Sequence, residues 1–401
     1  MALWLTSMRV VMGGESLIGQ KTGIGQYTEN LASQLLHTSE VEDLKFLAHG
    51  KIIPAKNLLD SAVSRKKKDS SLFDLVAKAR GIASQYRAAV WCYEGIMPLI
   101  EWRSLRAYKS QDIFHSPNYL LPNFPGKRVV SILDLSTFKY PQFHAHARVW
   151  QINKHINKAV GQADHIITIS DYVKNEIIEI FGIKKDKITT TYLAAGKQFR
   201  PMTDSIFSYR IAIPNLTYKS YFLCASTIEP RKNISRLLDA YQIYRGKEGS
   251  RALPLIMVGH PGWHSKALHR RIDSLKGANG VRYLGYVKQT QMPILFAGAR
   301  ALLFPSLYEG FGLPVLEAMQ AGTAVLTSSN SAMSEVAQNA AALIDPLDEQ
   351  AIADAICVLA SDDSKVKKLE AAGIVRSSNF TWEKCAERTL SIYKKLQFEG
   401  M

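Results

Sequence analysis

Along almost the whole chain, short apolar runs alternate with longer amphipathic segments, and this alternation limits the possible folds more than any other feature. The apolar runs predict strands at 9–12, 46–48, 113–116, 128–133, 165–169, 188–192, 221–225, 255–258, 281–284, 301–304, 324–327 and 342–344. Segments between them have helical periodicity, for example 27–36, 171–181 and 234–244. Strands that alternate with helices form parallel sheets covered by helices on both faces.

The alternation is interrupted near 199–217, where Pro201 and Pro214 predict a linker. The sequence therefore predicts an α/β fold of two Rossmann-like, doubly wound parallel-sheet domains. They are an N-terminal domain, 1–205, and a C-terminal domain, 215–380, followed by a terminal segment, 381–401. Ligands of such sheets bind at the carboxyl ends of the strands. If these ends of the two domains face a central cleft, the cleft can hold two substrates.

Nothing in the sequence predicts a membrane span or an exported protein. No run of about 18 or more apolar residues is present. The first residues, MALWLTSMR, lack the charged start and long apolar core of a signal peptide. We therefore expect a cytoplasmic protein. Its cysteines are far apart in the sequence, so neither a disulfide framework nor a zinc site is expected; they are Cys92, Cys224, Cys357 and Cys385.

The formal net charge is +15, and much of the excess lies between Lys45 and Arg128, with 15 Lys and Arg against 6 Asp and Glu. Four basic residues follow one another at 65–68, and basic residues alternate with aromatic and aliphatic ones at 86–91 and 102–109. This pattern favours peripheral contact with an anionic membrane surface. A solvated face with a flexible loop is the simpler alternative. The basic composition also suits nucleic acid, but the sequence has no nucleic-acid-binding module, and no such partner is expected.

The most informative stretch is 304–318, FPSLYEGFGLPVLEA, which follows an apolar run. Gly310 and Gly312 allow the backbone to approach a ligand closely, and Pro314 suits the first turn of a helix. The N-terminus of that helix offers amide groups and a positive dipole end to a phosphate. Glu309 before the helix and Glu317 about one turn inside it can border the same ligand. There they would accept hydrogen bonds from sugar hydroxyls.

A second stretch, 226–233, follows the apolar run 221–225 and contains Arg231 and Lys232 directly before a predicted helix. Cations are unfavourable at a helix N-terminus unless an anion is nearby. Arg231 and Lys232 could neutralise a diphosphate and stabilise it as it leaves. A surface Arg-Lys pair at the start of a helix is the alternative.

Glu309 and Glu317 resemble the Glu-x7-Glu signature of retaining glycosyltransferase family 4, and EPRKN at 229–233 resembles the phosphate-binding element of that family. The resemblance extends over nearly the whole chain, with further landmarks at 22–28, 165–171, 192–201, 258–263, 284–287 and 380–383. It implies the GT-B fold, in which a terminal helix, here within 381–401, crosses back to the N-terminal domain. The segments TGIGQYT, YLAAG and EPRKN are most similar to those of bacterial mannosyltransferases of surface polysaccharide biosynthesis.

The resemblance also implies roles for single residues. Glu309 would contact the hydroxyls of the donor sugar, Glu317 the nucleotide ribose, and Lys232 and Arg231 the diphosphate. The backbone amides of Gly312 to Val315 would cap the terminal phosphate. The complete donor-binding set that it implies is Gly23, Gly25, Gly259, Tyr286, Gly310, Phe311, Gly312, Leu313, Val315 and Glu317. Within this set, Gly259 and Tyr286 lie near the expected nucleobase pocket, and Gly23 and Gly25 bring the first domain to the substrates.

Asp134 follows the predicted strand 128–133 and is expected to face the cleft as a catalytic residue beside Glu309, Lys232 and Arg231. It would position the acceptor or the sugar. The family frequently has His immediately before this Asp, whereas Leu133 stands here. A front-face retaining reaction does not need that histidine, because an oxygen of the leaving phosphate can take the proton of the acceptor.

The residues HSPNY at 115–119 end another predicted strand, and we expect His115, Asn118 and Tyr119 to line the acceptor side. His144 and His146 follow Tyr140-Pro141. We interpret these two histidines as surface residues, with acceptor contact as the alternative.

The donor and the acceptor are expected from the resemblance alone. Mannose from GDP-mannose would go to a lipid-linked or oligosaccharide acceptor at the inner face of the cytoplasmic membrane, in polysaccharide or lipopolysaccharide biosynthesis. GDP-rhamnose or a UDP-sugar is the alternative donor. No Asp-x-Asp motif and no His-carboxylate cluster is present, so we expect neither a metal nor another cofactor.

Two other classes of protein remain as alternatives. In a nicotinamide-dependent dehydrogenase, the segment GIGQYT would have to supply the Gly-x-Gly-x-x-Gly fingerprint, but Thr28 stands at its last position. Such an enzyme also gives Glu309 and Glu317 no role. A non-catalytic sugar-nucleotide binder has the same fold, which cannot exclude it, but the intact set of carboxylates and cations argues against it.

Overall fold

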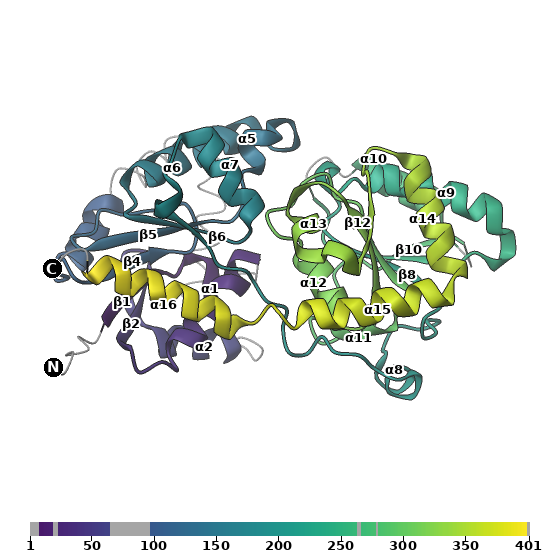
Figure 1. Ribbon diagram of the computed structural model, residues 1–401, viewed down its shortest axis with the longest axis horizontal. Coiled ribbons are helices and arrows are strands. Elements are labelled where there is room, and N and C mark those ends of the chain that lie inside the picture. The colour runs from purple at the N-terminus through teal and green to yellow at the C-terminus, as the bar shows by residue number, and fades with distance from the viewer. Residues whose placement is uncertain (1–7, 19–22, 65–96, 263–265, 278–279, 399–401) are drawn as a thin grey trace.

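The computed structural model describes residues 8–18, 23–64, 97–262, 266–277 and 280–398. They form two α/β domains that lie side by side along the long axis of the molecule (Figure 1). Each domain is built on one mostly parallel sheet with helices around it, so the predicted fold class is confirmed.

The N-terminal domain contains a seven-stranded sheet in the order β3-β2-β1-β4-β5-β6-β7. Its strands are β1 (Met8–Gly13), β2 (Val41–Ala48), β3 (Lys51–Pro54), β4 (Ile113–Ser116), β5 (Lys127–Ile132), β6 (His165–Thr168) and β7 (Ile188–Thr190). All pairs are parallel except β2 with β3. Its helices are α1 (Gly23–Leu35), α2 (Ala55–Ser64), α5 (Ser136–Lys139), α6 (His146–Gln162) and α7 (Asp171–Phe181).

The C-terminal domain contains a six-stranded parallel sheet in the order β10-β9-β8-β11-β12-β13. Its strands are β8 (Phe222–Ala225), β9 (Leu255–Val258), β10 (Val281–Tyr283), β11 (Ala301–Phe304), β12 (Ala324–Ser328) and β13 (Ala342–Ile344). The remaining helices are α8 (Asp204–Arg210), α9 (Ile234–Glu248), α10 (Lys266–Ser274), α11 (Met292–Gly298), α12 (Leu313–Gln320), α13 (Ser331–Ala337), α14 (Glu349–Ser361), α15 (Asp363–Ser377) and α16 (Trp382–Phe398).

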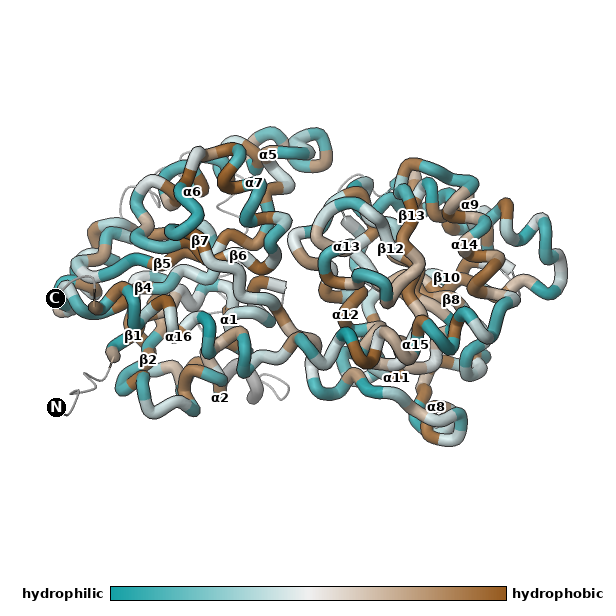
Figure 2. The backbone as a smooth tube through the Cα atoms, viewed as in Figure 1, coloured by the Kyte–Doolittle hydropathy of each residue, from teal (hydrophilic) through white to brown (hydrophobic). Residues whose placement is uncertain are grey.

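The central strands are buried on both faces, because helices cover both sides of each sheet. Every residue of β4, β6, β8, β9 and β11 is buried. Strands of this kind are continuous apolar runs in the sequence, and Figure 2 shows the hydrophobic segments gathered inside each domain. This is the physical reason why most strands can be located from the sequence.

Two features of the N-terminal domain differ from the prediction. β3 is not predicted, because its residues are half-buried or exposed and include Pro54, which is tolerated at the edge of a sheet. α1 begins at Gly23, four residues before the predicted start at Tyr27. Gly23 and Gly25 therefore lie in the first turn of a helix, and not in a loop that precedes it.

The chain crosses between the domains twice (Figure 1). After β7 it reaches α8, which packs on α11 of the C-terminal domain. An added Cβ at Gly298 would lie 2.1 Å from the ring of Phe207, so this contact depends on glycine. α8 therefore belongs to the C-terminal domain, and it begins eleven residues before the start expected at 215.

The second crossing follows α15 and leads into α16, which lies along the N-terminal domain. Tyr393 Oη of α16 is 2.6 Å from His115 Nδ1 of β4. Lys394 Nζ donates to Glu40 Oε1 at 2.8 Å. The last helix of the chain thus completes the first domain.

In the part of the chain that the structure describes, no helix is long and apolar enough to cross a membrane. Cys92 lies outside the described residues. Cys224, Cys357 and Cys385 form no disulfide.

Candidate active site

The two predicted donor-binding stretches meet at the carboxyl ends of β8 and β11, which are neighbours in the sheet. The loop after β11, residues 305–312, lies against a short 3-10 turn after β8, η4 (Pro230–Lys232). The N–H of Leu307 donates to the carbonyl of Arg231 at 2.9 Å. The side-chain amide of Asn233 donates to the carbonyl of Pro305 at 3.1 Å. The two stretches therefore form one structural unit.

Glu309 lies between two cations in this unit. Lys232 Nζ is 2.5 Å from Glu309 Oε1, and Arg231 Nη1 is 3.2 Å from Oε2. The hydroxyl of Ser306 also donates to Oε1, at 2.7 Å. Arg231 is held in addition by Glu229, at 2.9 Å. The side chains of Glu309, Lys232 and Arg231 are only 12–15% exposed, so little water screens this ion cluster.

The opposite charges of the ion cluster offset the energetic cost of burying each charged group. Burial by itself would raise the pKa of Glu309, but Lys232 and Arg231 outweigh it and lower the pKa to about 2. Burial lowers the pKa of Arg231, whereas Glu309, Asp134 and Glu229 raise it to above its ordinary value. Glu309 and Arg231 are therefore charged at neutral pH. An entering diphosphate would compete with Glu309 for the two cations.

α12 provides a helix N-terminus beside the ion cluster. Its N-cap, Gly312, has a φ of 93°, and an added Cβ there would lie 2.9 Å from Met333 Cγ, so only glycine fits. Val315 donates its N–H to the carbonyl of Gly312 at 2.9 Å, and Pro314 has no N–H. The predicted set of phosphate-binding amides is therefore narrowed to Gly312 and Leu313, whose N–H groups have no acceptor among the described residues.

Glu317, about one turn inside α12, is half-buried and has no hydrogen-bond or ionic partner among the described residues. Burial raises the pKa of Glu317 to about 8. Its carboxyl group is therefore mostly protonated at neutral pH. Ribose hydroxyls would supply the partners that it lacks, but its contact with ribose stays a prediction.

The tip of the 305–312 loop touches the N-terminal domain. An added Cβ on Gly310 would lie 2.0 Å from the carbonyl oxygen of Leu133 and 2.9 Å from Cβ of Asp134. The hydroxyl of Ser170 donates to the carbonyl of Gly310 at 2.7 Å, and it also caps α7 by accepting from the N–H of Val173 at 3.2 Å. The two domains therefore meet at the candidate site.

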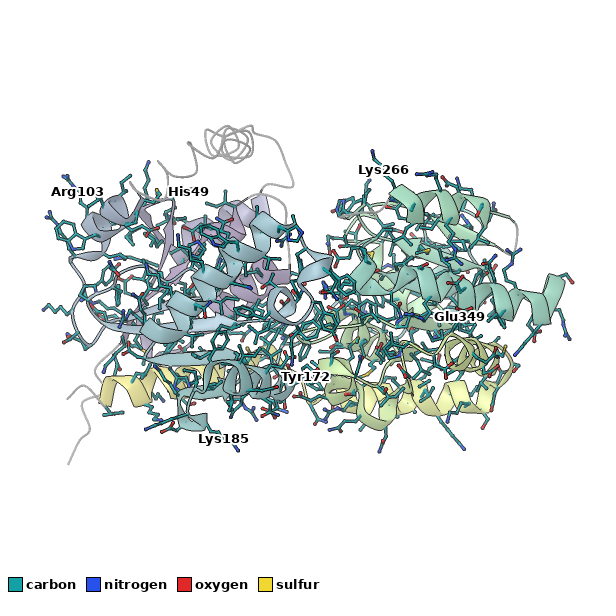
Figure 3. All side chains as sticks on the ribbon, turned by 90° about the horizontal axis from the view of Figure 1, so that it is seen from above. His49, Arg103, Tyr172, Lys185, Lys266 and Glu349 are labelled. Carbon is teal, nitrogen blue, oxygen red and sulfur yellow. The ribbon has the colours of Figure 1, made fainter. Side chains whose placement is uncertain are left out.

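Tyr308 and Glu335 also bind the N-terminal domain. The buried hydroxyl of Tyr308 donates to Glu176 Oε2 at 2.6 Å. Glu335 of α13 accepts the backbone N–H groups of Asp171 and Tyr172, both at 2.8 Å, at the N-terminus of α7. A carboxylate is favoured there by the helix dipole. Figure 3 labels Tyr172 at this junction of the domains.

Asp134 borders the space between the domains. Its Oδ1 accepts from the N–H and the hydroxyl of Ser136, at 3.0 and 2.8 Å. Its negative charge acts on Arg231 of the other domain and on Tyr119 of its own. The structure therefore brings Asp134 close to the ion cluster, and Tyr119 close to Asp134. Asn118 lies in the same loop as Tyr119, where its side-chain oxygen accepts from the N–H of Leu120 at 2.9 Å and shapes the turn.

His115 requires a correction, because the structure places it in the core and not at the acceptor side. Its Nδ1 is 2.6 Å from Tyr393 Oη and its Nε2 is 2.8 Å from Ser131 Oγ, so both ring nitrogens are occupied. The side chain has 0% exposure, and burial lowers the pKa of His115 to about 3. It is a neutral link between β4, β5 and α16.

Gly259 and Tyr286 follow β9 and β10 in the C-terminal domain, whereas Gly23 and Gly25 lie in the first turn of α1. Gly259 has a φ of 144°, and an added Cβ would lie 1.9 Å from the carbonyl oxygen of Ser226. Here glycine lets the ends of β8 and β9 approach each other. Tyr286 is 57% exposed and stacks on His260 at 4.7 Å between ring centroids. The predicted ligand contacts of Gly23, Gly25, Gly259 and Tyr286 stay predictions.

Among the residues that the structure describes, no group of three or more His, Cys, Asp or Glu is placed to hold a metal ion. The expected independence from metal stays a prediction.

The family described as Glycosyl transferases group 1 matches residues 210–376, which include the ion cluster and α12. The O-antigen chain mannosyltransferase B of Escherichia coli is 33% identical over 389 residues, which cover 97% of this chain and 100% of that protein. The chain belongs to the group 1 glycosyltransferases.

Further comparisons agree with this family. The O-antigen chain mannosyltransferase RfbU of Salmonella typhimurium is 27% identical to this glycosyltransferase over 258 residues, which cover 64% of this chain and 67% of RfbU. A crystal structure of HepE from Anabaena, in complex with UDP and glucose, has a TM-score of 0.70 at 16% identity and covers 96% and 99% of the two chains. The structural likeness shows the shared GT-B fold. Retention of configuration and membership of family 4 stay predictions.

Several residues of the site were not singled out in the sequence of this glycosyltransferase. Tyr308 stands directly before Glu309, so its place in the sequence could have marked it as a residue of the site. Ser170 and Glu335 acquire their roles only when the other domain approaches, so no local pattern marks them. His144, interpreted as a surface residue, lies near Asp134 and Arg231, and its electrostatic interactions reach both.

We predict that Gly310→Ala separates the two domains at the site without unfolding either. Its Cβ would meet the backbone of Leu133, which cannot move aside as a flexible side chain can. Since a misplacement of about 1 Å can cost about a hundredfold in rate, sugar transfer should fall by about that factor. Transfer assays and thermal unfolding measure the two effects.

Gly161→Ala in α6 is the matched control, because an added Cβ there meets nothing within 4 Å. It should leave transfer unchanged and should not lower the melting temperature. Unchanged transfer by Gly310→Ala would show that the close contact between Gly310 and Leu133 is not needed for the reaction.

We predict that Glu317→Gln removes a pH dependence of stability. The folded protein keeps Glu317 protonated up to about pH 8, whereas the unfolded chain releases this proton above about pH 4.3. In this window the folded state binds more protons, so its stability falls as pH rises. Glutamine cannot ionise, so the variant should be the more stable protein above about pH 8. Urea unfolding at several pH values tests this, and parallel curves for both proteins would contradict the raised pKa.

Proposed function

We propose that this glycosyltransferase moves mannose from GDP-mannose to a lipid-linked or oligosaccharide acceptor in the biosynthesis of a surface polysaccharide or lipopolysaccharide. The observation that carries the proposal is the 33% identity to an O-antigen chain mannosyltransferase over nearly the whole of both proteins. A second relative, at 27% identity, is also an O-antigen chain mannosyltransferase.

In this proposal the C-terminal domain binds the donor. Arg231 and Lys232 hold the diphosphate, and the free N–H groups of Gly312 and Leu313 contact its terminal phosphate. As the diphosphate takes over the two cations, the carboxylate of Glu309 becomes available for hydrogen bonds from the sugar hydroxyls. The same carboxylate thus neutralises the cations when the site is empty and orients the sugar when it is occupied.

We propose that the reaction retains the anomeric configuration. The acceptor oxygen bonds to the anomeric carbon on the face from which the diphosphate leaves. The bond from that carbon to the phosphate oxygen breaks, and a phosphate oxygen takes the proton of the acceptor. Lys232 and Arg231 stabilise the negative charge that develops on the diphosphate, so the step requires neither a metal ion nor a separate base. Asp134, on the opposite domain, orients the acceptor or the sugar.

Other donors give the alternative within the same class of enzyme. A UDP-sugar is favoured by one observation, the bound UDP and glucose in HepE, which shares the fold. GDP-rhamnose would use the same diphosphate contacts as GDP-mannose. A non-catalytic sugar-nucleotide binder is disfavoured, because Glu309, Lys232 and Arg231 are all present and in contact.

Titration calorimetry with GDP, UDP, ADP, dTDP and NAD, each with and without EDTA, tests the donor. We expect GDP to bind most tightly and EDTA to have no effect. Incubation with GDP-mannose and a lipid-linked glycan should then give an α-mannoside, as determined by NMR. Preference for UDP would replace mannose by another sugar, and binding of none of these nucleotides would contradict the proposal.

Glu309→Gln and Lys232→Ala should have opposite effects on the binding of GDP. Removing the carboxylate frees both cations, so Glu309→Gln should bind GDP several-fold more tightly than the wild type. The same variant should transfer the sugar about 100-fold or more slowly, because a contact to the transition state is lost. Lys232→Ala should weaken the binding of GDP but not that of guanosine. Calorimetry and transfer assays measure both effects, and weaker GDP binding by Glu309→Gln would refute the proposed competition.

We further propose that the N-terminal domain binds an anionic membrane surface. Residues 97–105 are helical, and on this segment Leu99 and Trp102 are 69% and 55% exposed. Trp150 of α6 is 63% exposed. Arg106 lies over the ring of Trp102 and Lys154 over that of Trp150, so a cation accompanies each exposed indole. Figure 3 shows Arg103, on the same segment as Trp102, at the end of the molecule away from the C-terminal domain.

The basic stretches 65–68 and 86–91, which are part of the same prediction, lie outside the described residues. The exposed indoles with their cations therefore support the membrane proposal, because such pairs bind at the boundary of headgroups and acyl chains.

Trp102→Ala and Trp150→Ala should each weaken binding to anionic phosphatidylglycerol vesicles several-fold, as measured by co-sedimentation. Added salt should weaken the binding further, because the attraction of the basic residues is screened. Tyr209→Ala is the control, since Tyr209 is 92% exposed on α8 of the other domain. Equal losses for all three variants, or no binding by the wild type, would contradict a membrane face at this position.

A further inference from the structure

His144 lies directly after a short 3-10 turn, η2 (Pro141–Phe143). In front of this turn, the ring of Tyr140 packs on that of Tyr308, with 5.4 Å between the centroids. Tyr308 immediately precedes Glu309. The backbone that carries His144 is therefore anchored beside the ion cluster, although it belongs to the other domain.

The Nε2 atom of His144 is buried and has no hydrogen-bond partner among the described residues. Buried polar atoms in folded proteins are almost always paired, and an exception calls for a ligand or another function. Asp134, a nearby acceptor, does not bond to this nitrogen. Its Oδ1 accepts from the N–H and the hydroxyl of Ser136 instead. The ring thus has an unused, buried nitrogen in the neighbourhood of Asp134 and Arg231.

The charges around His144 come from three elements. Arg148 stands on α6, Asp134 follows β5, and Arg231 and Glu229 lie at η4 of the C-terminal domain. Burial lowers the pKa of His144, the two arginines lower it further, and the two carboxylates partly offset these effects. The free protein therefore keeps the imidazole neutral at pH 7. An additional anion beside the ring would favour its cationic form.

We propose that His144 is a catalytic residue whose Nε2 donates a hydrogen bond to the diphosphate of the bound donor, from the side of the N-terminal domain. The diphosphate then lies between His144 on one domain and Arg231 with Lys232 on the other. Its negative charge balances the arginines, so the imidazole takes up a proton as the donor binds. In the transition state the same group stabilises the leaving diphosphate. This inference rests on the proposed donor-binding role of the ion cluster.

The inferred proton uptake makes the affinity for the diphosphate depend on pH in a defined direction. Between the lowered pKa of the free histidine and its raised value in the complex, binding takes up a proton, so the affinity falls as pH rises. Free GDP also gains protons on its terminal phosphate near pH 6. That contribution is common to all variants, and a comparison with His144→Gln removes it.

The test is calorimetry of GDP and of UDP with the wild type and with His144→Gln, between about pH 6 and pH 8, where histidine titrates. Buffers of different ionisation enthalpy report the number of protons taken up. We expect His144→Gln to bind the diphosphate about tenfold more weakly, as for the loss of one charge-assisted hydrogen bond. It should also lose the proton uptake. His146→Gln, on the exposed neighbouring histidine, should behave as the wild type.

A second variant separates this role from a structural one. His144→Phe keeps the bulk of the ring, and neither of the two nitrogens that it removes has a hydrogen-bond partner among the described residues. The ligand-free variant should therefore unfold at the same temperature as the wild type or above it, while its affinity for GDP falls as in His144→Gln. A lower melting temperature of ligand-free His144→Phe would identify a structural role and overturn the inference.

The remaining outcomes are distinguishable. If the wild type binds GDP and His144→Gln matches it in affinity and proton uptake, the inference on His144 is wrong and the proposed function stands. If the wild type binds neither nucleotide at any pH, the proposed function is wrong, and the inference falls with it.

Discussion

The ion cluster of Glu309, Lys232 and Arg231 is the interaction on which the rest of the candidate site depends. Buried charges are tolerated only when opposite charges and hydrogen bonds compensate for the lost water. Here the cations come from the turn after β8 and the carboxylate from the loop after β11, so the compensation fixes the two loops to each other. The same loop then carries Tyr308 and Gly310 towards the N-terminal domain, and it leads into the N–H groups at the start of α12 that have no acceptor among the described residues.

The contact between the domains is built from specific polar groups around one very close approach of two backbones. Ser170, Tyr308 and Glu335 each exchange hydrogen bonds across it. Polar groups of this kind can exchange their partners for water when domains separate, whereas a large apolar interface cannot. The site is thus completed by polar links that can exchange their partners for water, and its two sides belong to different domains.

The fold could be predicted because buried parallel strands are continuous apolar runs, whereas the short, exposed β3 has no such run. The meeting of Arg231, Lys232 and Glu309 could be predicted as well, because both stretches follow strands and carry recognisable residues. His115 could not be interpreted correctly, since one of its two partners, Tyr393, comes from a helix 278 residues later in the chain. The surroundings of His144 depend on Arg231 and Glu229 of the other domain, which no local pattern reveals.

The double passage of the chain between the domains has a mechanical consequence. One segment runs from β7 to α8 and the other from α15 to α16, so the two bodies are joined by a pair of covalent links (Figure 1). A single link would act as a swivel and allow one body to turn freely about it. Two links together resist twisting and favour bending about one axis. Such a joint would keep the same faces of the two domains in register through any opening of the space between them.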